Sequence, residues 1–194
     1  MKPELAPAML LNAYAQGVFP MADENDEIHW YSPDPRTIID LERFHAPRTL
    51  RQLYRQERFE LTINQAFEAV IDGCADRSEG TWINADMREA YVALHGLGFA
   101  HSVEAWQEDR LVGGLYGLAL GGAFFGESMF HRAANASKVA LVYLVERMQQ
   151  RGFALLDTQF TTEHLRQFNC VELSRGEYLE RLDEALCVDC RLAD

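Results

Sequence analysis

The spacing of apolar residues along this 194-residue chain predicts alternating helices and strands. In several segments apolar side chains recur every three or four residues, the pattern of a helix that buries one face. These segments are residues 5–16, 64–75, 84–96, 136–150 and 174–186. Asn64 and Asn84 are predicted N-caps, and Ser174 with Glu177 predicts a capping box. Short helices are also predicted after Pro47 and after Thr161.

Between residues 99 and 130 the pattern changes to that of strands. Apolar runs at 100–106, 111–118 and 123–130 are separated by turn residues at 108–109 and 121–122. This arrangement predicts an antiparallel meander. Further strands are predicted at 154–159 and at Ile38-Ile39. The fold class is therefore a mixed α/β fold, with a central and largely antiparallel sheet flanked by helices.

The distribution of proline and glycine predicts two parts of unequal size. All six prolines lie in the first 47 residues, whereas twelve of the thirteen glycines lie beyond residue 70. We therefore expect a small N-terminal α+β lobe at residues 1–60 and a larger domain at 61–194. Within the lobe, residues 17–20 are predicted to form an irregular turn. Two prolines in 30–36 exclude a helix or a central strand and predict a rigid loop.

Composition narrows the class of function. The chain is 48% hydrophobic, yet no stretch approaches the roughly 18 apolar residues of a membrane span. With no secretory signal apparent, we expect a cytoplasmic protein without a membrane partner. The net charge of −12 argues against general nucleic-acid binding, which depends on phosphate contacts.

Arginines form a local exception to this acidic balance. Arg48, Arg51, Arg55 and Arg58 are spaced to share one face of a helix. The planar guanidinium group suits phosphate because it can bind two oxygens. The spacing is compatible with a contact to an RNA backbone, although from this feature alone a solvated charged face is the favoured interpretation.

Metal, redox and nucleotide sites find little support. Cys187 and Cys190 form a C-x-x-C without the second ligand pair that zinc needs, and the six histidines show no ligand spacing. The stretch from Gly113 to Gly117 matches no phosphate-binding loop. Its glycines predict close approach of a ligand or another backbone. We expect no metal and no cofactor.

Three polar residues in apolar strands are candidates for catalysis. Asp157 and Gln159 are two apart on a strand and are predicted to point the same way, so the carboxylate could orient the amide. Glu127 lies in an apolar run, where a carboxylate is costly unless paired. Two structural alternatives remain: Asp157 as a helix cap, and Glu127 as the ion-pair partner of Lys138 or Arg132.

Seven short motifs occur in a fixed order. They are Tyr14-Ala15-Gln16-Gly17-Val18-Phe19-Pro20, Trp30-Tyr31-Ser32-Pro33-Asp34-Pro35-Arg36, Glu79-Gly80-Thr81-Trp82-Ile83, His101-Ser102-Val103-Glu104, Leu111-Val112-Gly113-Gly114-Leu115-Tyr116-Gly117, Gly126-Glu127-Ser128-Met129-Phe130 and Asn135-Ala136-Ser137-Lys138. Together they resemble the leucyl/phenylalanyl-tRNA–protein transferases of bacteria, from about residue 8 to residue 182.

This resemblance implies an activity and its partners. Such enzymes transfer leucine or phenylalanine, and less efficiently methionine, from aminoacyl-tRNA to proteins with N-terminal arginine or lysine. The products are marked for degradation by the N-end rule pathway. The resemblance also implies an acetyltransferase-like catalytic domain that uses neither metal nor coenzyme.

The resemblance further implies roles for individual residues. Asp157 and Gln159 would form the catalytic relay, with Glu127 nearby. Tyr14 and Trp82 would hold the terminal adenosine, so that the N-terminal lobe contributes to binding the tRNA 3′ end. The pocket for the donor side chain would be lined by Leu115, Phe124, Leu141, Leu144 and Leu156. Two departures are Met21, where the family often has an aromatic residue, and extra N-terminal sequence in longer members.

Two other readings compete with this resemblance. An acetyl-CoA-dependent N-acetyltransferase could use the same fold, but the chain lacks a basic glycine loop for pyrophosphate. A non-catalytic RNA-binding module would fit poorly with the charge of −12.

Overall fold

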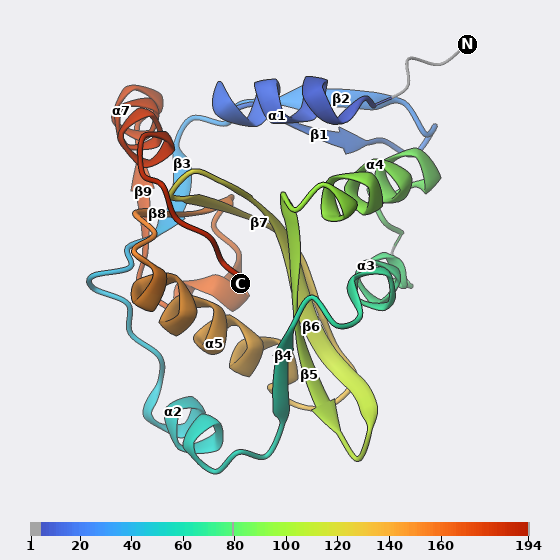
Figure 1. Cartoon of the computed structure of the whole chain (residues 1–194), viewed down its shortest axis with the longest axis vertical. Coiled ribbons are helices and arrows are strands. Elements are labelled where there is room, and N and C mark those ends of the chain that lie inside the picture. The colour runs from blue at the N-terminus through green and yellow to red at the C-terminus, as the bar shows by residue number, and fades with distance from the viewer. Residues whose placement is uncertain (1–4, 79, 194) are drawn as a thin grey trace.

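The computed structural model describes residues 5–78 and 80–193, so Glu79 of the third motif lies outside the described residues. The chain begins with a helix and a two-stranded hairpin that lie together at one end of the molecule (Figure 1). These are α1 (Pro7–Ala15), β1 (Phe19–Ala22) and β2 (Ile28–Tyr31). The two strands pair antiparallel, from Phe19 opposite Tyr31 to Ala22 opposite Ile28.

A seven-stranded sheet forms the centre of the molecule. Its order is β4-β5-β6-β7-β8-β3-β9. The strands are β3 (Arg36–Ile39), β4 (Glu60–Ile63), β5 (Ala100–Gln107), β6 (Arg110–Leu120), β7 (Ala123–His131), β8 (Leu155–Gln159) and β9 (Cys170–Leu173). Every neighbouring pair is antiparallel except β7 and β8. The predicted meander and the mixed α/β class are confirmed.

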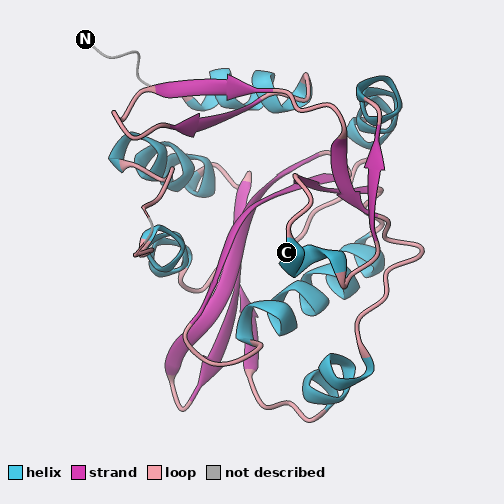
Figure 2. Ribbon diagram, turned by 180° about the vertical axis from the view of Figure 1, so that it is seen from behind, coloured by secondary structure: helices cyan, strands magenta, loops and turns pink. Residues whose placement is uncertain are grey.

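Helices cover both faces of this sheet (Figures 1 and 2). The helices that follow α1 are α2 (Arg48–Arg55), α3 (Phe67–Ala75), α4 (Ala85–Gly96), α5 (Ala136–Arg151), α6 (Glu163–Arg166) and α7 (Arg175–Leu186). One core cluster joins side chains of α1, α3, α4 and α7, and the other joins side chains of α2 and α5. The periodic apolar faces read from the sequence are the faces that pack on the sheet.

The junction of β7 and β8 determines where a site can form. Their parallel pairing covers only Ala123–Phe125 on β7 and Leu155–Asp157 on β8. Both strands continue beyond this pairing, β7 to His131 and β8 to Gln159. Parallel strands need a crossover connection, and here the 16-residue α5 supplies it. Beyond these residues β7 pairs only with β6 and β8 only with β3, so the two strands separate from each other next to the start of α5.

Gly113 of β6 allows α5 to begin close to the sheet. A Cβ atom at Gly113 would lie 2.5 Å from the Cβ atom of Ala136, the first residue of α5. No real pair of Cβ atoms approaches so closely, and any larger residue would displace the helix. The glycine-rich stretch was predicted to let a ligand or another part of the backbone approach closely. This is confirmed for the start of α5, which approaches Gly113.

Two of the predicted N-caps are confirmed and one is wrong. The Asn84 side chain accepts from the Met87 N–H, and Ser174 with Glu177 forms the capping box. Asn64 does not cap α3. Its Oδ1 atom instead accepts from the Ser102 N–H at 3.1 Å. The Ala66 N–H at the start of α3 is taken by a carboxylate across the sheet, that of Glu104, at 3.3 Å.

Four short strands, β1, β2, β4 and β9, were not predicted. Each has four residues, too few to display an alternating pattern. β4 and β9 are the two edges of the sheet and are fixed by pairing with partners distant in sequence. The segment 30–36 is not wholly a loop, since Trp30 and Tyr31 belong to β2.

The small lobe is shorter than the predicted 1–60. β3 lies between β8 and β9 in the large sheet, and the Tyr54 hydroxyl of α2 donates to Glu146 of α5 at 2.8 Å. Residues from Arg36 onward therefore belong to the larger part. The excess of proline reflects the turns of this segment and does not mark a boundary near residue 60.

Among the described residues, none of the helices has the length and apolar character needed to cross a bilayer.

Candidate active site

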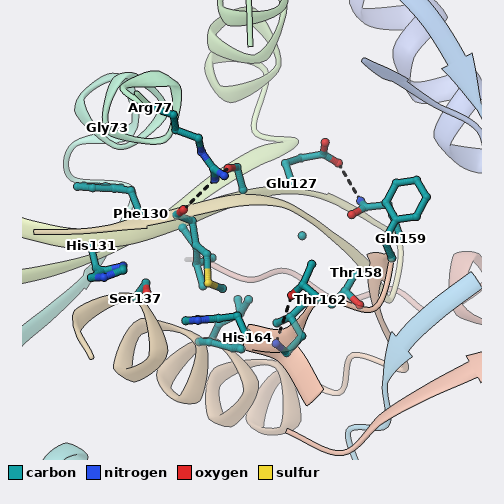
Figure 3. A pocket seen from close by; sticks show the side chains of 18 of the residues that line it. Gly73, Arg77, Glu127, Phe130, His131, Ser137, Thr158, Gln159, Thr162 and His164 are labelled. Atoms are coloured by element: carbon teal, nitrogen blue, oxygen red, sulfur yellow. Dashed lines mark hydrogen bonds between the residues drawn. The ribbon is translucent and has the colours of Figure 1, made fainter. Parts of the chain in front are cut away.

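A cavity of about 660 Å³ opens where β7 and β8 separate (Figure 3). Its walls come from the ends of these two strands, the segment after β8, the start of α5 and the end of α3. A volume of this size falls within the range of small-molecule sites, which is about 300–1,000 Å³.

One part of the cavity wall is apolar. Leu115 of β6, Leu141 and Leu144 of α5, and Leu156 of β8 line it. Leu141 and Leu144 are three residues apart and so share one helical face. Phe124, the fifth residue predicted for this wall, does not line the cavity and is fully buried in the core. Met129 and Phe130 line the cavity and were not predicted.

Glu127 projects from β7 into the same cavity. Its Oε1 atom accepts from the Tyr14 hydroxyl at 2.7 Å, and its Oε2 atom accepts from the Tyr91 hydroxyl at 3.1 Å. Within the described residues it forms no ion pair with Lys138 or Arg132, so that alternative is wrong. Burial raises the pKa of Glu127 to about 7, although both tyrosine hydroxyls favour its charged form.

The two tyrosines form a fixed donor pair for this carboxylate. Tyr14 and Tyr91 are fully buried, and their hydroxyls also lie in contact with each other; because each has one hydrogen, both can donate to the charged Glu127 only when neither donates to the other. Burial raises the pKa of both hydroxyls well above the usual value, so both stay protonated at neutral pH. Tyr91 was not predicted to belong to the site, because its spacing on α4 is also that of a core residue.

Gln159 reaches Glu127 from the end of β8. Its amide Nε2 atom donates to Glu127 Oε1 at 3.3 Å (Figure 3). Its backbone has a φ of 58°, which is uncommon for a residue other than glycine and typical of functional sites. This conformation ends the extended strand. The Gln159 side-chain amide consequently contacts Glu127, and the predicted hydrogen bond between this side-chain amide and the Asp157 carboxylate is not found among the described residues.

Asp157 lies behind the cavity and is fully buried. Its carboxylate accepts from Arg36 Nη2 at 2.6 Å and from the Tyr178 hydroxyl at 2.8 Å. It also accepts from the Gln159 backbone N–H at 2.8 Å. Asp157 therefore holds the backbone at Gln159 and does not cap the following helix, whose cap is Thr162.

Arg36 is the cation that balances Asp157. Burial of Arg36 disfavours its charged form, but the hydrogen bonds and charge of Asp157 raise its pKa overall. Its guanidinium carbon lies 4.7 Å from the ring centroid of Phe19 and 4.6 Å from that of Tyr178. The Nη1 atom donates to the Gly17 carbonyl at 3.1 Å. Arg36 thus joins the small lobe, the sheet and α7 around one carboxylate.

The two residues predicted to hold an adenosine differ in position. Trp82 lines the cavity and is half-buried, so its ring is open to a ligand. Tyr14 has no exposed surface, and its ring packs on Phe125 with centroids 5.0 Å apart. The structure leaves no face of Tyr14 open to a nucleobase, and its contact in the site is with Glu127.

The four predicted phosphate-binding arginines are all exposed. Arg48, Arg51 and Arg55 belong to α2, whereas Arg58 follows the end of this helix and so falls outside the helical stripe. None of the four lines the cavity. Leu50 anchors α2 in the core cluster that contains the buried residues of α5.

A candidate metal group lies elsewhere. Among the described residues, Asp23, Glu27 and His29 bring their ligand atoms within 4.8 Å of one another. The group belongs to the β1–β2 hairpin, and none of its members lines the cavity.

The arrangement of the cavity suits acyl transfer to an amine. A buried carboxylate whose pKa is near neutrality can accept a proton at physiological pH. The leucine wall lies in the same cavity and can hold an apolar acyl side chain close to it. Gln159 supplies a neutral hydrogen-bonding group that leaves the charge of Glu127 unchanged.

Two family models match almost the whole chain. The model described as leucyl/phenylalanyl-tRNA protein transferase matches residues 38–183. The model described as the N-terminal domain of leucyl/phenylalanyl-tRNA protein transferase matches residues 3–34. The division between them, residues 35–37, falls at the start of β3.

Curated relatives agree with these models. A leucyl/phenylalanyl-tRNA–protein transferase of Gloeobacter violaceus is 53% identical over 188 residues, covering 96% of this chain and 97% of the relative. One from Paramagnetospirillum magneticum is 56% identical over 184 residues, covering 92% and 88%. One from Maricaulis maris is 56% identical over 182 residues, covering 91% and 84%.

Among solved structures, L-PGS from Bacillus licheniformis gives a TM-score of 0.45 at 14% identity. The match covers 86% of this chain and 58% of that chain.

Proposed function

This chain belongs to the leucyl/phenylalanyl-tRNA–protein transferase family and is an aminoacyltransferase, and we propose that it transfers leucine or phenylalanine to N-terminal arginine or lysine of acceptor proteins. Methionine is a less efficient donor. The product N-terminus directs the acceptor to the N-end rule degradation pathway. We place the enzyme in the cytoplasm, where its aminoacyl-tRNA donor is found.

One observation carries the proposed chemistry: the leucine wall and the hydrogen-bonded pair of Glu127 and Gln159 line one cavity. The acyl side chain of the donor lies against Leu115, Leu141, Leu144 and Leu156. Apolar pockets distinguish a methylene group by only about 1–3 kcal/mol, so overlapping use of leucine, phenylalanine and methionine is expected.

The reaction exchanges an ester for an amide. The neutral α-amine of the acceptor attacks the ester carbonyl, and Glu127 accepts the proton that the amine loses. A C–N bond forms, the ester C–O bond breaks, and the tRNA 3′-oxygen leaves as a hydroxyl with the proton that Glu127 returns to it. Gln159 orients Glu127, while Asp157, itself paired with Arg36, holds the backbone of Gln159. The ester is already activated, so orientation is the main contribution of the enzyme.

A transfer assay tests this function. The protein is incubated separately with radiolabelled Leu-, Phe- and Met-tRNA and a peptide that begins with arginine. We expect label in the peptide from all three donors, least from Met-tRNA. A peptide of the same sequence with an acetylated N-terminus is the control, because it has no free amine. Label in neither peptide would contradict the proposal.

Filling the leucine wall should change donor preference. Leu115 is 3% exposed and lines the cavity. Leu115→Trp should reduce use of Phe-tRNA by about tenfold more than use of Leu-tRNA, since the added ring occupies space that the larger donor needs. Competition between the two charged tRNAs measures the ratio. Leu115→Met, which conserves volume, should keep the wild-type ratio. An unchanged ratio in Leu115→Trp would remove Leu115 from the donor pocket.

The exposed arginines of α2 should bind the tRNA backbone. Replacing Arg48 and Arg51 with glutamine should weaken Phe-tRNA binding and reduce the salt dependence by about one unit of slope per lost contact. Arg110 and Arg191 are exposed and lie outside α2. Replacing both with glutamine serves as the control, because that variant has the same net charge as the α2 variant. Transfer from a minimal phenylalanyl-adenosine donor should change little. Equal losses with both donors would show that the α2 arginines support the fold.

A further inference from the structure

Two polar side chains that line the cavity have no hydrogen-bond partner among the described residues, one at the start of α5 and one on α6. Ser137 is 1% exposed and lines the cavity, and no hydrogen bond to its hydroxyl is found among the described residues. His164 also lines the cavity, and its Nε2 atom is buried without a hydrogen-bond partner. Buried polar groups are nearly always paired, so the His164 Nε2 atom, with the Ser137 hydroxyl on the same cavity, favours a ligand that pairs them.

The helix end adds further hydrogen-bond donors. α5 is 16 residues long, and its N-cap residue Asn135 has a φ of 69° and provides no side-chain cap. The first N–H groups of a helix have no partner within it, and the helix dipole places positive potential there. An uncapped helix start beside a cavity therefore favours an anion.

The surrounding side chains support an anion. Burial lowers the pKa of His164, and nearby Lys138 and His131 lower it further, so both side chains lie in the neighbourhood of the imidazole. Carboxylates are also present in the cavity, since Glu127 and Asp76 line it. Figure 3 shows Glu127 and Gln159 at one side of the cavity and His131 and Ser137 at the other. The end at α5 thus combines donors and positive charge in a chain whose net charge is −12.

We propose that the N-terminus of α5, with Ser137, Lys138 and His164, forms a phosphate-binding subsite for the 5′-phosphate of the terminal nucleotide of the donor. This inference rests on the proposed function, which supplies an RNA donor. The leucine wall has no group that can hydrogen-bond to an anion, and the acceptor amine carries no negative charge that the subsite could bind. The phosphodiester next to the acylated ribose is the anion nearest to the reacting ester.

The spacing along α5 agrees with this assignment. Ser137, Leu141 and Leu144 are four and three residues apart and lie on one face of the helix. At about 1.5 Å per residue, Ser137 and Leu144 are separated by about 10 Å along the axis. A nucleotide with its acyl group spans a comparable length. One helix face can therefore hold the phosphate at its start and the acyl side chain one to two turns later.

The test compares two minimal donors that differ by one phosphate: 3′-O-phenylalanyl-adenosine and its 5′-phosphorylated form. The wild-type protein should show a lower KM for the phosphorylated donor. Lys138→Met and, separately, Ser137→Ala should raise the KM of the phosphorylated donor by about tenfold, the loss of one charge-assisted contact. For the phosphate-free donor the KM should rise by less than about twofold.

A charge control and an inhibition assay complete the test. Arg110→Met removes the same charge from the exposed first residue of β6 and should leave both KM values at the wild-type level. AMP should inhibit the wild-type protein more strongly than adenosine, and Lys138→Met should abolish this difference. Equal use of the two donors by the wild-type protein, or equal losses with both in the variants, would overturn the subsite. Transfer from neither donor would instead overturn the proposed function.

Discussion

Glu127→Gln is expected to lower single-turnover transfer by about 10²- to 10⁴-fold, the usual contribution of a positioned proton acceptor. The fold should persist, because the amide has the same shape and its oxygen can still accept from one of the tyrosines that bind Glu127. Glu108→Gln removes an exposed carboxylate from the β5–β6 turn and should leave transfer unchanged. Full transfer by Glu127→Gln would exclude Glu127 as the acceptor.

The pH profile gives this prediction a second readout. Burial raises the pKa of Glu127 to about 7, and only the deprotonated form can accept a proton. Transfer by the wild-type protein should therefore rise as pH increases through about 7. The acceptor α-amine must also be neutral, and it titrates near 7.7–8.0. In Glu127→Gln the increase in transfer near pH 7 should disappear, whereas the increase caused by deprotonation of the acceptor amine should remain. If the increase near pH 7 persists in the variant, it belongs to another group.

Asp157→Asn is expected to affect both stability and transfer. The substitution leaves Arg36, which is 1% exposed, without its buried counter-charge. Removing one partner of a buried ion pair costs about 3–5 kcal/mol. For a chain of this length we expect Tm to fall by about 6–20 °C. Transfer should also fall, because Asp157 fixes the backbone of Gln159.

A double variant separates the two effects. Arg36→Met with Asp157→Leu replaces the buried pair by apolar side chains and should regain much of the lost stability. Transfer should remain low, since neither new side chain can accept from the Gln159 N–H. Thermal melting and single-turnover transfer are measured on the same preparations. A double variant with recovered stability and normal transfer would show that the pair of Arg36 and Asp157 serves the fold alone.

Much of the fold follows from local patterns. The periodicity of residues 136–150 predicts α5 within one residue, and the turns at 108–109 and 121–122 predict the meander. These features depend on interactions between residues close in sequence. β4 and β9 could not be predicted in this way, because four residues carry little pattern and their pairing partners lie far along the chain.

The residues of the site can likewise be separated into those that the sequence indicated and those that it did not. Glu127 and Gln159 stand out in the sequence because polar residues in apolar strands demand an explanation, and both line the cavity. The resemblance to one family named four of the leucines that line it. The contact between Gln159 and Glu127 was not predicted, because a strand with regular alternation would have turned Gln159 toward Asp157. The positive φ at Gln159 breaks that alternation.

The sequence by itself determined the long helices and strands, the resemblance to one family, and Glu127, Asp157 and Gln159 as polar residues of interest. Tertiary structure decided which of these residues meet. Asp157 pairs with Arg36, 121 positions away, and Tyr14 donates to Glu127, 113 positions away. Tyr14 could be predicted as a ligand contact or as a buried residue, and only the packing of α1 against α4 and the sheet resolves this. The physical reason is that burial, and the pKa shifts it causes, depend on every element that surrounds a group, whereas a pattern reports only its neighbours along the chain.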